Sequence, residues 1–146
     1  MSSVHIYLTF DGNCEEAFSM YRSIFGGDYA SISRFGEMPP QEGMPPVPED
    51  QLEKIMHVSL PIGEHSLLMG SDTGGDWGKK HQPGNNFSIS VDADSKEQAD
   101  QYFSKLAEGG QVIMGINNTF WGSYFGMLTD RFGISWMVSF DTSNKK

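Results

Sequence analysis

The chain carries the same hydrophobic pattern twice. Residues 6–27 begin with alternating apolar and polar positions, as in a strand with one buried face, and continue with apolar positions three to four apart, as in an amphipathic helix. Residues 87–110 repeat this order, and both stretches end in Gly-Gly, which favours the left-handed backbone that ends a helix. Three further β-prone runs follow each Gly-Gly pair. The pattern predicts two modules, each made of one strand, one helix and three strands.

Two places along this pattern have the signature of a helix start. Asn13 with Glu16, and again Ser95 with Gln98, have the spacing of a capping box, in which the first side chain accepts a hydrogen bond from a backbone N–H. The spacing of apolar residues then predicts the buried helix faces, which are Ala17, Met20, Tyr21 and Ile24 in the first helix, and Ala99, Tyr102, Phe103 and Leu106 in the second.

Alternation within the strands predicts two sides for each sheet. Phe10, Phe87 and Trp136 are among the residues expected to pack against the helices. The other side mixes small polar groups with an imidazole, a phenol and a thioether, which suits an amphipathic ligand held by a few hydrogen bonds. A sheet face open to solvent shows the same alternation, so both interpretations stay open. The residues expected on this other side are His5, Tyr7, Thr9, His57, Asn86, Ser88 and Met137.

Two irregular stretches interrupt the pattern. Residues 73–85 are rich in glycine and charge, and they predict a linker between module one, about 4–72, and module two, about 86–141, of a single domain spanning 1–146. Residues 37–51 contain five prolines, which exclude regular structure there. This proline-rich loop is interpreted as a lid, a dimer contact or a plain hairpin excursion.

Side chains outside the strands add further candidates. Trp121 is one of four aromatic residues in 119–126, a density typical of a ligand site, a dimer interface or a core. Glu37, at the edge of the proline-rich loop, is a candidate ligand contact or general base. For an anionic ligand, Arg34 and Lys54 are the cations expected near the site.

Composition narrows the class of partner. The chain has 146 residues and a formal net charge of −9, so it lacks the basic surface that binds nucleic acids or anionic membranes. The single cysteine, Cys14, excludes an internal disulfide framework and a multi-cysteine zinc site. We find no apolar run of membrane-spanning length, and we therefore expect a cytoplasmic protein with no nucleic-acid or membrane partner.

Four segments resemble one known group of proteins. They are YLTFDGNCEEAFSMYRSIFGG, RFGEMP, IMHVSLPIGEHSLLMGSD and NTFWGSYFGMLTDRFGISWMV, which follow one another over nearly the whole chain. The chain resembles the PhnB-like group of the vicinal oxygen chelate (glyoxalase/bleomycin resistance/dioxygenase) superfamily. The resemblance implies an α+β fold in which tandem βαβββ modules form an open barrel-like mixed sheet around a cavity. It also implies a homodimer.

The resemblance further implies four metal-ligand positions, one on each of four strands. Metal-binding members place histidine, glutamine or carboxylate ligands there, the last of them a glutamate after a turn of the form D-x-x-G-x-x-[I/W]-E. In this chain the turn is Asp130–Gly133, and the matching ligand positions hold His5, Met69, Asn86 and Met137. One imidazole, two thioethers and a carboxamide are poor ligands for a hard divalent cation. We therefore expect neither a metal nor another cofactor.

The expected function is binding of a small amphipathic molecule in the sheet cavity. A metal-free enzyme using Tyr7, His57 or Glu37, and a metal-dependent lyase, isomerase or dioxygenase with rearranged ligands such as His5 and His57, stay open as alternatives. Members of the group also carry a methyltransferase label, but the first strand ends in FDGNCEE, without the Gly-rich loop of that fold. The residues expected to line the cavity are His5, Tyr7, Thr9, Glu37, His57, Met69, Asn86, Ser88, Trp121 and Met137.

Overall fold

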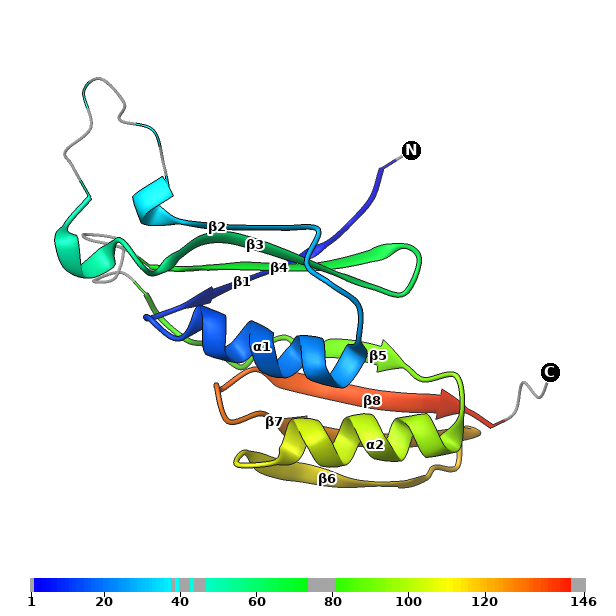
Figure 1. Ribbon diagram of the computed structural model, residues 1–146. Coiled ribbons are helices and arrows are strands. Elements are labelled where there is room, and N and C mark those ends of the chain that lie inside the picture. The colour runs from blue at the N-terminus through cyan, green and yellow to red at the C-terminus, as the bar shows by residue number, and fades with distance from the viewer. Residues whose placement is uncertain (1, 38, 40–42, 44–46, 74–80, 143–146) are drawn as a thin grey trace. The chain divides into compact units, whose positions relative to one another are not determined.

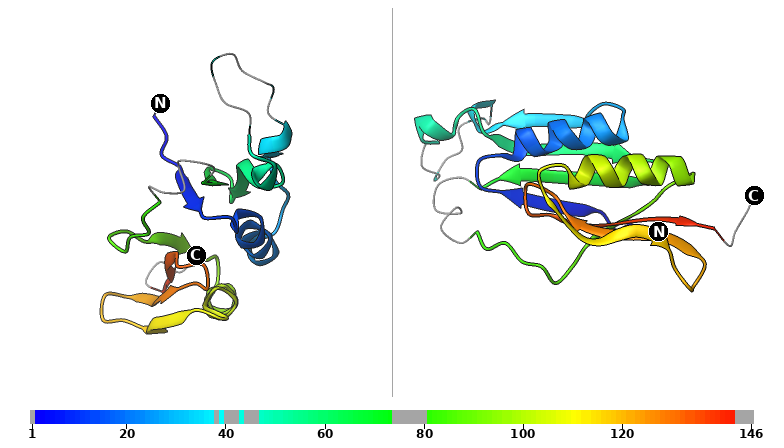
Figure 2. Two further views of the ribbon diagram at one scale, coloured as in Figure 1. Left: turned by 90° about the vertical axis from the view of Figure 1, so that its left-hand side faces the viewer. Right: turned by 90° about the horizontal axis from the view of Figure 1, so that it is seen from below.

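The chain is seen in a computed structural model that describes residues 2–37, 39, 43, 47–73 and 81–142 (Figure 1). Most of the predicted linker, and nearly half of the proline-rich loop, lie outside these residues. The chain divides into two compact units, Met1–Gln82 and Pro83–Lys146. Each unit contains one helix and one open four-stranded mixed sheet, and the helix lies along one face of the sheet of its own unit (Figure 2).

Unit 1 has the predicted order of strand, helix and three strands. Its sheet order is β1-β4-β3-β2, in which β1 and β4 are parallel and the other neighbours antiparallel. Two short 3-10 turns flank the proline-rich loop. The elements are β1 (Ile6–Phe10), α1 (Cys14–Phe25), β2 (Ser31–Arg34), η1 (Phe35–Glu37), η2 (Glu49–Gln51), β3 (Ile55–Ile62) and β4 (Ser66–Asp72).

Unit 2 repeats this order and topology. Its sheet order is β5-β8-β7-β6, again with one parallel pair, β5 and β8. The α+β fold of tandem βαβββ modules is therefore confirmed. The elements are β5 (Ile89–Asp92), α2 (Lys96–Ala107), β6 (Gln111–Asn118), β7 (Ser123–Thr129) and β8 (Ser135–Asp141).

The core of unit 1 lies between α1 and its sheet. Phe18 is fully buried and meets the rings of Phe10 and Tyr21 edge-on, at centroid distances of 6.1 and 5.5 Å. It also lies over Gly70 of β4, where a Cβ would stand 2.7 Å from the Phe18 ring, so the close approach of helix and strand requires glycine. The predicted helix face was wrong in part, because Phe18 and Cys14 are buried while Met20 is only half-buried.

The core of unit 2 is built the same way. Trp136 and Val138 of β8 are fully buried, and Phe103 of α2 lies over Gly126 of β7, whose Cβ would stand 2.6 Å from the Phe103 ring. Phe87 was wrongly expected to pack with them. It is 58% exposed, because β5 begins only at Ile89 and the strand alternation does not extend back to it.

The two helices begin in different ways. The prediction for Ser95 is confirmed, since its hydroxyl accepts a hydrogen bond from the Gln98 backbone N–H at 3.0 Å. The prediction for Asn13 was wrong, because its side chain makes no cap bond. Instead the buried carboxylate of Asp72, at the end of β4, accepts hydrogen bonds from the backbone N–H groups of Cys14 and Ile55, both at 2.9 Å.

Candidate functional site

The sheet of unit 1 has one face that α1 does not cover, and we call it the hydroxyl face. Its residues alternate with core residues such as Leu8 and Val58, which pack on the α1 side. Strand register places Tyr7 beside Met69, Met69 beside Ser59, and Ser59 beside Ser31, so one row crosses all four strands. The hydroxyl face consists of Tyr7, Thr9, Ser31, Ser33, His57, Ser59, Met69 and Ser71.

An aromatic pair stands on the hydroxyl face. The rings of Tyr7 on β1 and His57 on β3 are 5.8 Å apart between centroids and tilted by 31°. Tyr7 is 49% exposed, so its ring and hydroxyl are accessible. A phenol and an imidazole both donate and accept hydrogen bonds, and both rings can stack on a planar group. The pair can therefore hold the polar or aromatic part of a small organic molecule.

One other predicted residue of unit 1, His5, lies apart from this pair. His5 precedes β1, and within the described residues its buried Nδ1 has no hydrogen-bond partner. In the strand register Thr9 on β1 pairs with Ser71 on β4, and His57 on β3 is level with both. His5 comes four residues before Thr9, so His5 and His57 are offset by four residues along the strands and by two strands across the sheet. At about 3.3 Å per residue and 4.8 Å per strand, their Cα atoms are roughly 16 Å apart. That is too far for both rings to bind one ion at a Zn–N distance of about 2 Å.

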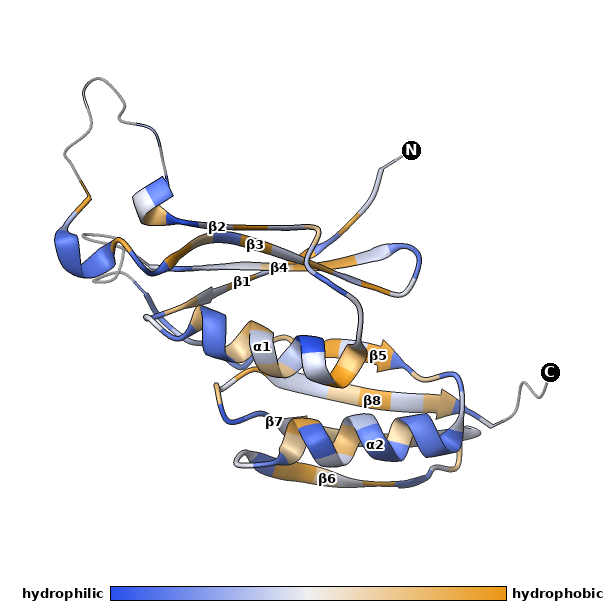
Figure 3. Cartoon of the chain, viewed as in Figure 1, coloured by the Kyte–Doolittle hydropathy of each residue, from blue (hydrophilic) through white to orange (hydrophobic). Residues whose placement is uncertain are grey.

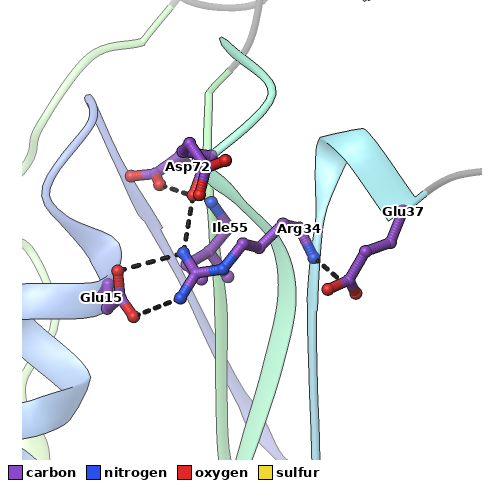
Figure 4. A network of polar contacts seen from close by, with 6 residues as sticks. Glu15, Arg34, Glu37, Ile55 and Asp72 are labelled. Carbon is purple, nitrogen blue, oxygen red and sulfur yellow. Dashed lines mark hydrogen bonds and ion pairs between the residues drawn. The ribbon is translucent and has the colours of Figure 1, made fainter.

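Arg34 belongs to the opposite side of the unit 1 sheet (Figure 4). Its Nη1 and Nη2 donate to the two carboxylate oxygens of Glu15 on α1 at 3.1 and 2.5 Å, and Nη1 also donates to the Glu53 carbonyl at 2.7 Å. The hydrogen bond from Arg34 lowers the pKa of Glu15, despite a small opposing effect of burial. Because Glu15 already holds this guanidinium, Arg34 does not present a free charge to an anion.

Glu37 stands at the end of β2 in η1. Its carboxylate is exposed and accepts a hydrogen bond from the Arg34 backbone N–H at 3.2 Å, which holds the turn that closes the strand (Figure 4). The strand face with Tyr7 and His57 is formed by other residues, so the contacts of Glu37 in this structure are those of a turn.

In unit 2 a buried aspartate orients β8. The Asp130 carboxylate accepts hydrogen bonds from the backbone N–H groups of Phe132 and Ile134 and from Trp136 Nε1, at 2.9, 3.0 and 2.8 Å. This fixes the turn and holds Trp136 on the α2 side, where it is fully buried. Because neighbouring side chains alternate, Met137 stands on the sheet face that α2 leaves uncovered.

Thioethers line up on that face. Met137 pairs with Met127 of β7, and Met127 pairs with Met114 of β6, so three methionines cross three neighbouring strands. We call the surface of Met114, Phe125, Met127 and Met137 the thioether face. Sequence reasoning anticipated only Met137. The alternation of Tyr124 and Leu128 with Phe125 and Met127 was the available signal, since the first two are buried and the others are not.

The remaining predicted residues of unit 2 lie outside its strands. Asn86 is exposed and Ser88 half-buried, and both precede β5. Trp121 is 54% exposed in the turn between β6 and β7, where it contacts the rings of Phe120 and Phe125 at 5.0 and 5.8 Å. The contact with Phe125 brings Trp121 to the edge of the thioether face, whereas Asn86 and Ser88 lie in the segment before β5.

The described residues present neither an exposed thiol nor a metal-binding cluster of His, Cys, Asp and Glu side chains. Cys14 is buried, and burial, reinforced by the charges of Asp72 and Glu15, raises the pKa of its thiol. A thiol in that state is a poor nucleophile. Within the described ranges no group of three or more His, Cys, Asp or Glu side chains is placed to hold a metal ion. At the ligand positions implied by the resemblance, a thioether at Met69 or Met137 does not suit a hard divalent cation.

Comparison with known proteins agrees with the fold. The sequence profile of the 3-demethylubiquinone-9 3-methyltransferase family matches residues 2–139. Protein YjdN of Escherichia coli K12 is 32% identical, over 91% of each chain. The structure of protein PA1353 from Pseudomonas aeruginosa is 40% identical, covers 97% of this chain and 98% of its own, and superposes with a TM-score of 0.81.

Two further solved structures are similar to this chain. A PhnB protein from Bacillus cereus is 25% identical, over 95% of this chain and 99% of its own, with a TM-score of 0.73. A glyoxalase/bleomycin resistance/dioxygenase family enzyme from Burkholderia phytofirmans shares the fold, with 16% identity over 92% and 96% of the two chains and a TM-score of 0.58. Neither helix in the described part of the chain is long and apolar enough to cross a membrane. The chain therefore belongs to the 3-demethylubiquinone-9 3-methyltransferase family, a PhnB-like group with the glyoxalase-like fold.

Proposed function

We propose that this protein binds a small amphipathic organic molecule on the face of the unit 1 sheet that α1 leaves uncovered, without the divalent metal of the wider superfamily. The single observation that carries the proposal is the Tyr7–His57 ring pair on the hydroxyl face, with centroids 5.8 Å apart. The proposal also takes the protein to be a cytoplasmic homodimer, as its resemblance to the superfamily implies.

The residues of the hydroxyl face support this proposal. Five of its eight residues are serine or threonine, and their hydroxyls offer both hydrogen-bond donors and acceptors. Tyr7 and His57 are the two large polar side chains on this face. Ligand sites with a few placed polar groups beside rings are typical of small-molecule binding proteins.

Unit 2 has an uncovered sheet face of its own, the thioether face. Met127 and Met137 are half-buried, and Phe125 beside them packs against Trp121. Methionine side chains are flexible and polarisable, so they adapt to apolar groups of different shape. The thioether face is therefore suited to apolar groups.

Methyl transfer, named in the family description, has little support in these residues. Only residues 11–13 separate β1 from α1, which leaves no room for the Gly-rich phosphate-binding loop of the nucleotide-binding α/β folds. Membership of the family therefore supports the fold of this chain, but it does not assign methyl transfer to it.

The ligand proposal is tested by a thermal-shift screen of amphipathic small molecules, followed by titration of the best compound. We expect Tyr7→Phe and His57→Gln each to weaken its binding by about tenfold, the effect of losing one good hydrogen bond. Tyr29→Phe and His65→Gln are matched controls, because Tyr29 contacts Arg22 and the His65 side chain is 91% exposed. Equal affinity of all four variants would remove the Tyr7–His57 pair from the site.

The metal-free part is tested by elemental analysis of untagged protein and by adding Zn²⁺, Ni²⁺ and Mn²⁺ in the same thermal-shift assay. We expect less than stoichiometric metal and no rise in melting temperature. About one metal per chain, lost in His5→Gln, would refute this part and favour the metal-dependent lyase, isomerase or dioxygenase. Product formation from the bound compound, abolished in Tyr7→Phe, would instead favour the metal-free enzyme.

A further inference from the structure

Unit 2 places all of its methionines in one row. Residues 83–146 contain three methionines, one on each of β6, β7 and β8. Met127 pairs with Met114 on one side and with Met137 on the other, so the three stand next to one another across neighbouring strands. We call these three residues the methionine row. On β5 the row is continued by Ser90, which pairs with Met137.

A bulge in β6 brings the third methionine into the row. Val112 pairs with Leu128, so an uninterrupted antiparallel pair would set Ile113 opposite Met127. The register shifts between Val112 and Met114, and Met114 takes that place instead. Bulges are over-represented next to active sites, where they re-aim a side chain. The register irregularity therefore completes the row.

The methionine row is accessible, whereas the positions next to it are packed. Leu128 follows Met127 and Val138 follows Met137, and both are buried on the α2 side. Met127 and Met137 are only half-buried, and Met114 is 46% exposed. Figure 3 shows the hydrophobic colour in the first half of β6, which contains Met114. An ion can therefore reach the thioethers from solvent.

The spacing of the row lets three sulfur atoms meet. Paired residues on neighbouring strands have Cβ atoms about 4.5–5.5 Å apart, so the two outer side chains are roughly 10 Å apart with the third between them. A methionine side chain has three rotatable bonds and can bend toward its neighbour. Met114 and Met137 can both turn their Sδ atoms toward that of Met127, which gives a ligand set of three sulfurs.

Unit 2 offers a metal ion no other soft ligand. Residues 83–146 contain neither histidine nor cysteine, and Gly109 to Thr129, which include β6 and β7, contain no charged residue. Thioethers select soft ions such as Cu(I), whereas Mg²⁺, Ca²⁺ and Mn²⁺ suit carboxylates and carbonyls. The chain has a net charge of −9, so it attracts a cation, which meets no Lys or Arg on β6 or β7.

We infer that Met114, Met127 and Met137 form a binding site for Cu(I). The inference concerns unit 2 alone and does not rest on the ligand proposed for the hydroxyl face. Of the four ligand positions implied by the resemblance it uses only Met137, and it needs neither histidine nor carboxylate. Because oxygen oxidises Cu(I), the site is loaded only under reducing conditions, and the expectation for Zn²⁺, Ni²⁺ and Mn²⁺ is unchanged.

Anaerobic calorimetric titration of the full chain with tetrakis(acetonitrile)copper(I) tests the site. We expect about one Cu(I) per chain. Met114→Leu, Met127→Leu and Met137→Leu should each weaken binding at least about tenfold, because loss of a residue that only supports a metal ligand already costs about 10–100-fold. Met20→Leu is the matched control, since Met20 is half-buried on α1. Leucine nearly conserves the volume of methionine, so we expect the variants to fold, and their melting temperatures check this.

X-ray absorption at the copper edge gives a second readout. Three sulfur neighbours and no nitrogen neighbour, with binding weakened in the three variants and not in the control, support the assignment. Absence of binding, binding that the three variants leave unchanged, or equal weakening by Met20→Leu overturns it. Binding lost in Met69→Leu or His5→Gln, while Met114→Leu and Met127→Leu bind normally, places the ion at the ligand positions implied by the resemblance and also overturns it.

Discussion

The two modules share one order of elements, yet their helices are anchored by different means. α2 begins at Ser95, whose hydroxyl binds a backbone N–H three residues ahead. α1 is anchored by Asp72, 58 residues away in sequence, which also binds the Ile55 backbone N–H at the start of β3. One anchor stabilises a helix alone, whereas the other joins a helix to two strands. The same fold is therefore stabilised locally in one module and through a buried tertiary contact in the other.

The largest effect is expected from Asp72→Ala. The change leaves two buried backbone N–H groups without an acceptor, and we expect the free energy of unfolding to fall by about 3 kcal/mol. Urea denaturation followed by circular dichroism measures it. Asp28→Ala is the control, because its carboxylate is 91% exposed and makes one 3.4 Å ion pair. A loss no larger than that of the control would mean that Asp72 does not anchor α1.

A smaller effect is expected from Ser95→Ala. Loss of one cap bond at an exposed helix start costs about 1 kcal/mol. Asn13→Ala at the corresponding place in module one should cost much less, because the Asn13 side chain makes no cap bond. The same denaturation experiment compares the two variants. Equal losses would contradict the difference between the two helix starts.

The smallest effect is expected from the ion pair beside the α1 start. Arg34 lowers the folded-state pKa of Glu15, so the pair adds stability above the ordinary glutamate pKa of about 4.3, and this stability is lost as pH falls through the lowered value. The Glu15 side chain is 55% exposed, so we expect Glu15→Gln to cost no more than about 0.5 kcal/mol at pH 7. Denaturation of both proteins at pH 7 and pH 3 checks this. A difference that persists at pH 3 would show that charge is not its cause.

Sequence reasoning succeeded where the determining contacts are local. The order of elements follows from periodicity, and the Ser95 cap follows from a spacing of three residues. It failed for the Asp72 anchor, because no pattern near Cys14 indicates a carboxylate at the far end of the module. It also placed Phe87 in the core by extending the alternation two residues before β5 begins.

The candidate site was likewise predictable only where local pattern determines it. Alternation alone placed Tyr7 and His57 on the side of the sheet away from α1, and Met137 away from α2. Their neighbours depend on strand register, which single strands do not encode. The alignment of Met137 with Met127 and Met114 became visible only once β8, β7 and β6 were paired.

The buried thiol at the start of α1 is a natural reporter of local unfolding in module one. Cys14 is the only cysteine, its side chain is fully buried, and its backbone N–H is held by Asp72. A thiol reagent can therefore reach it only when the helix start separates from β4, so the labelling rate reports how often module one opens. No probe needs to be introduced, because Cys14 is already part of module one.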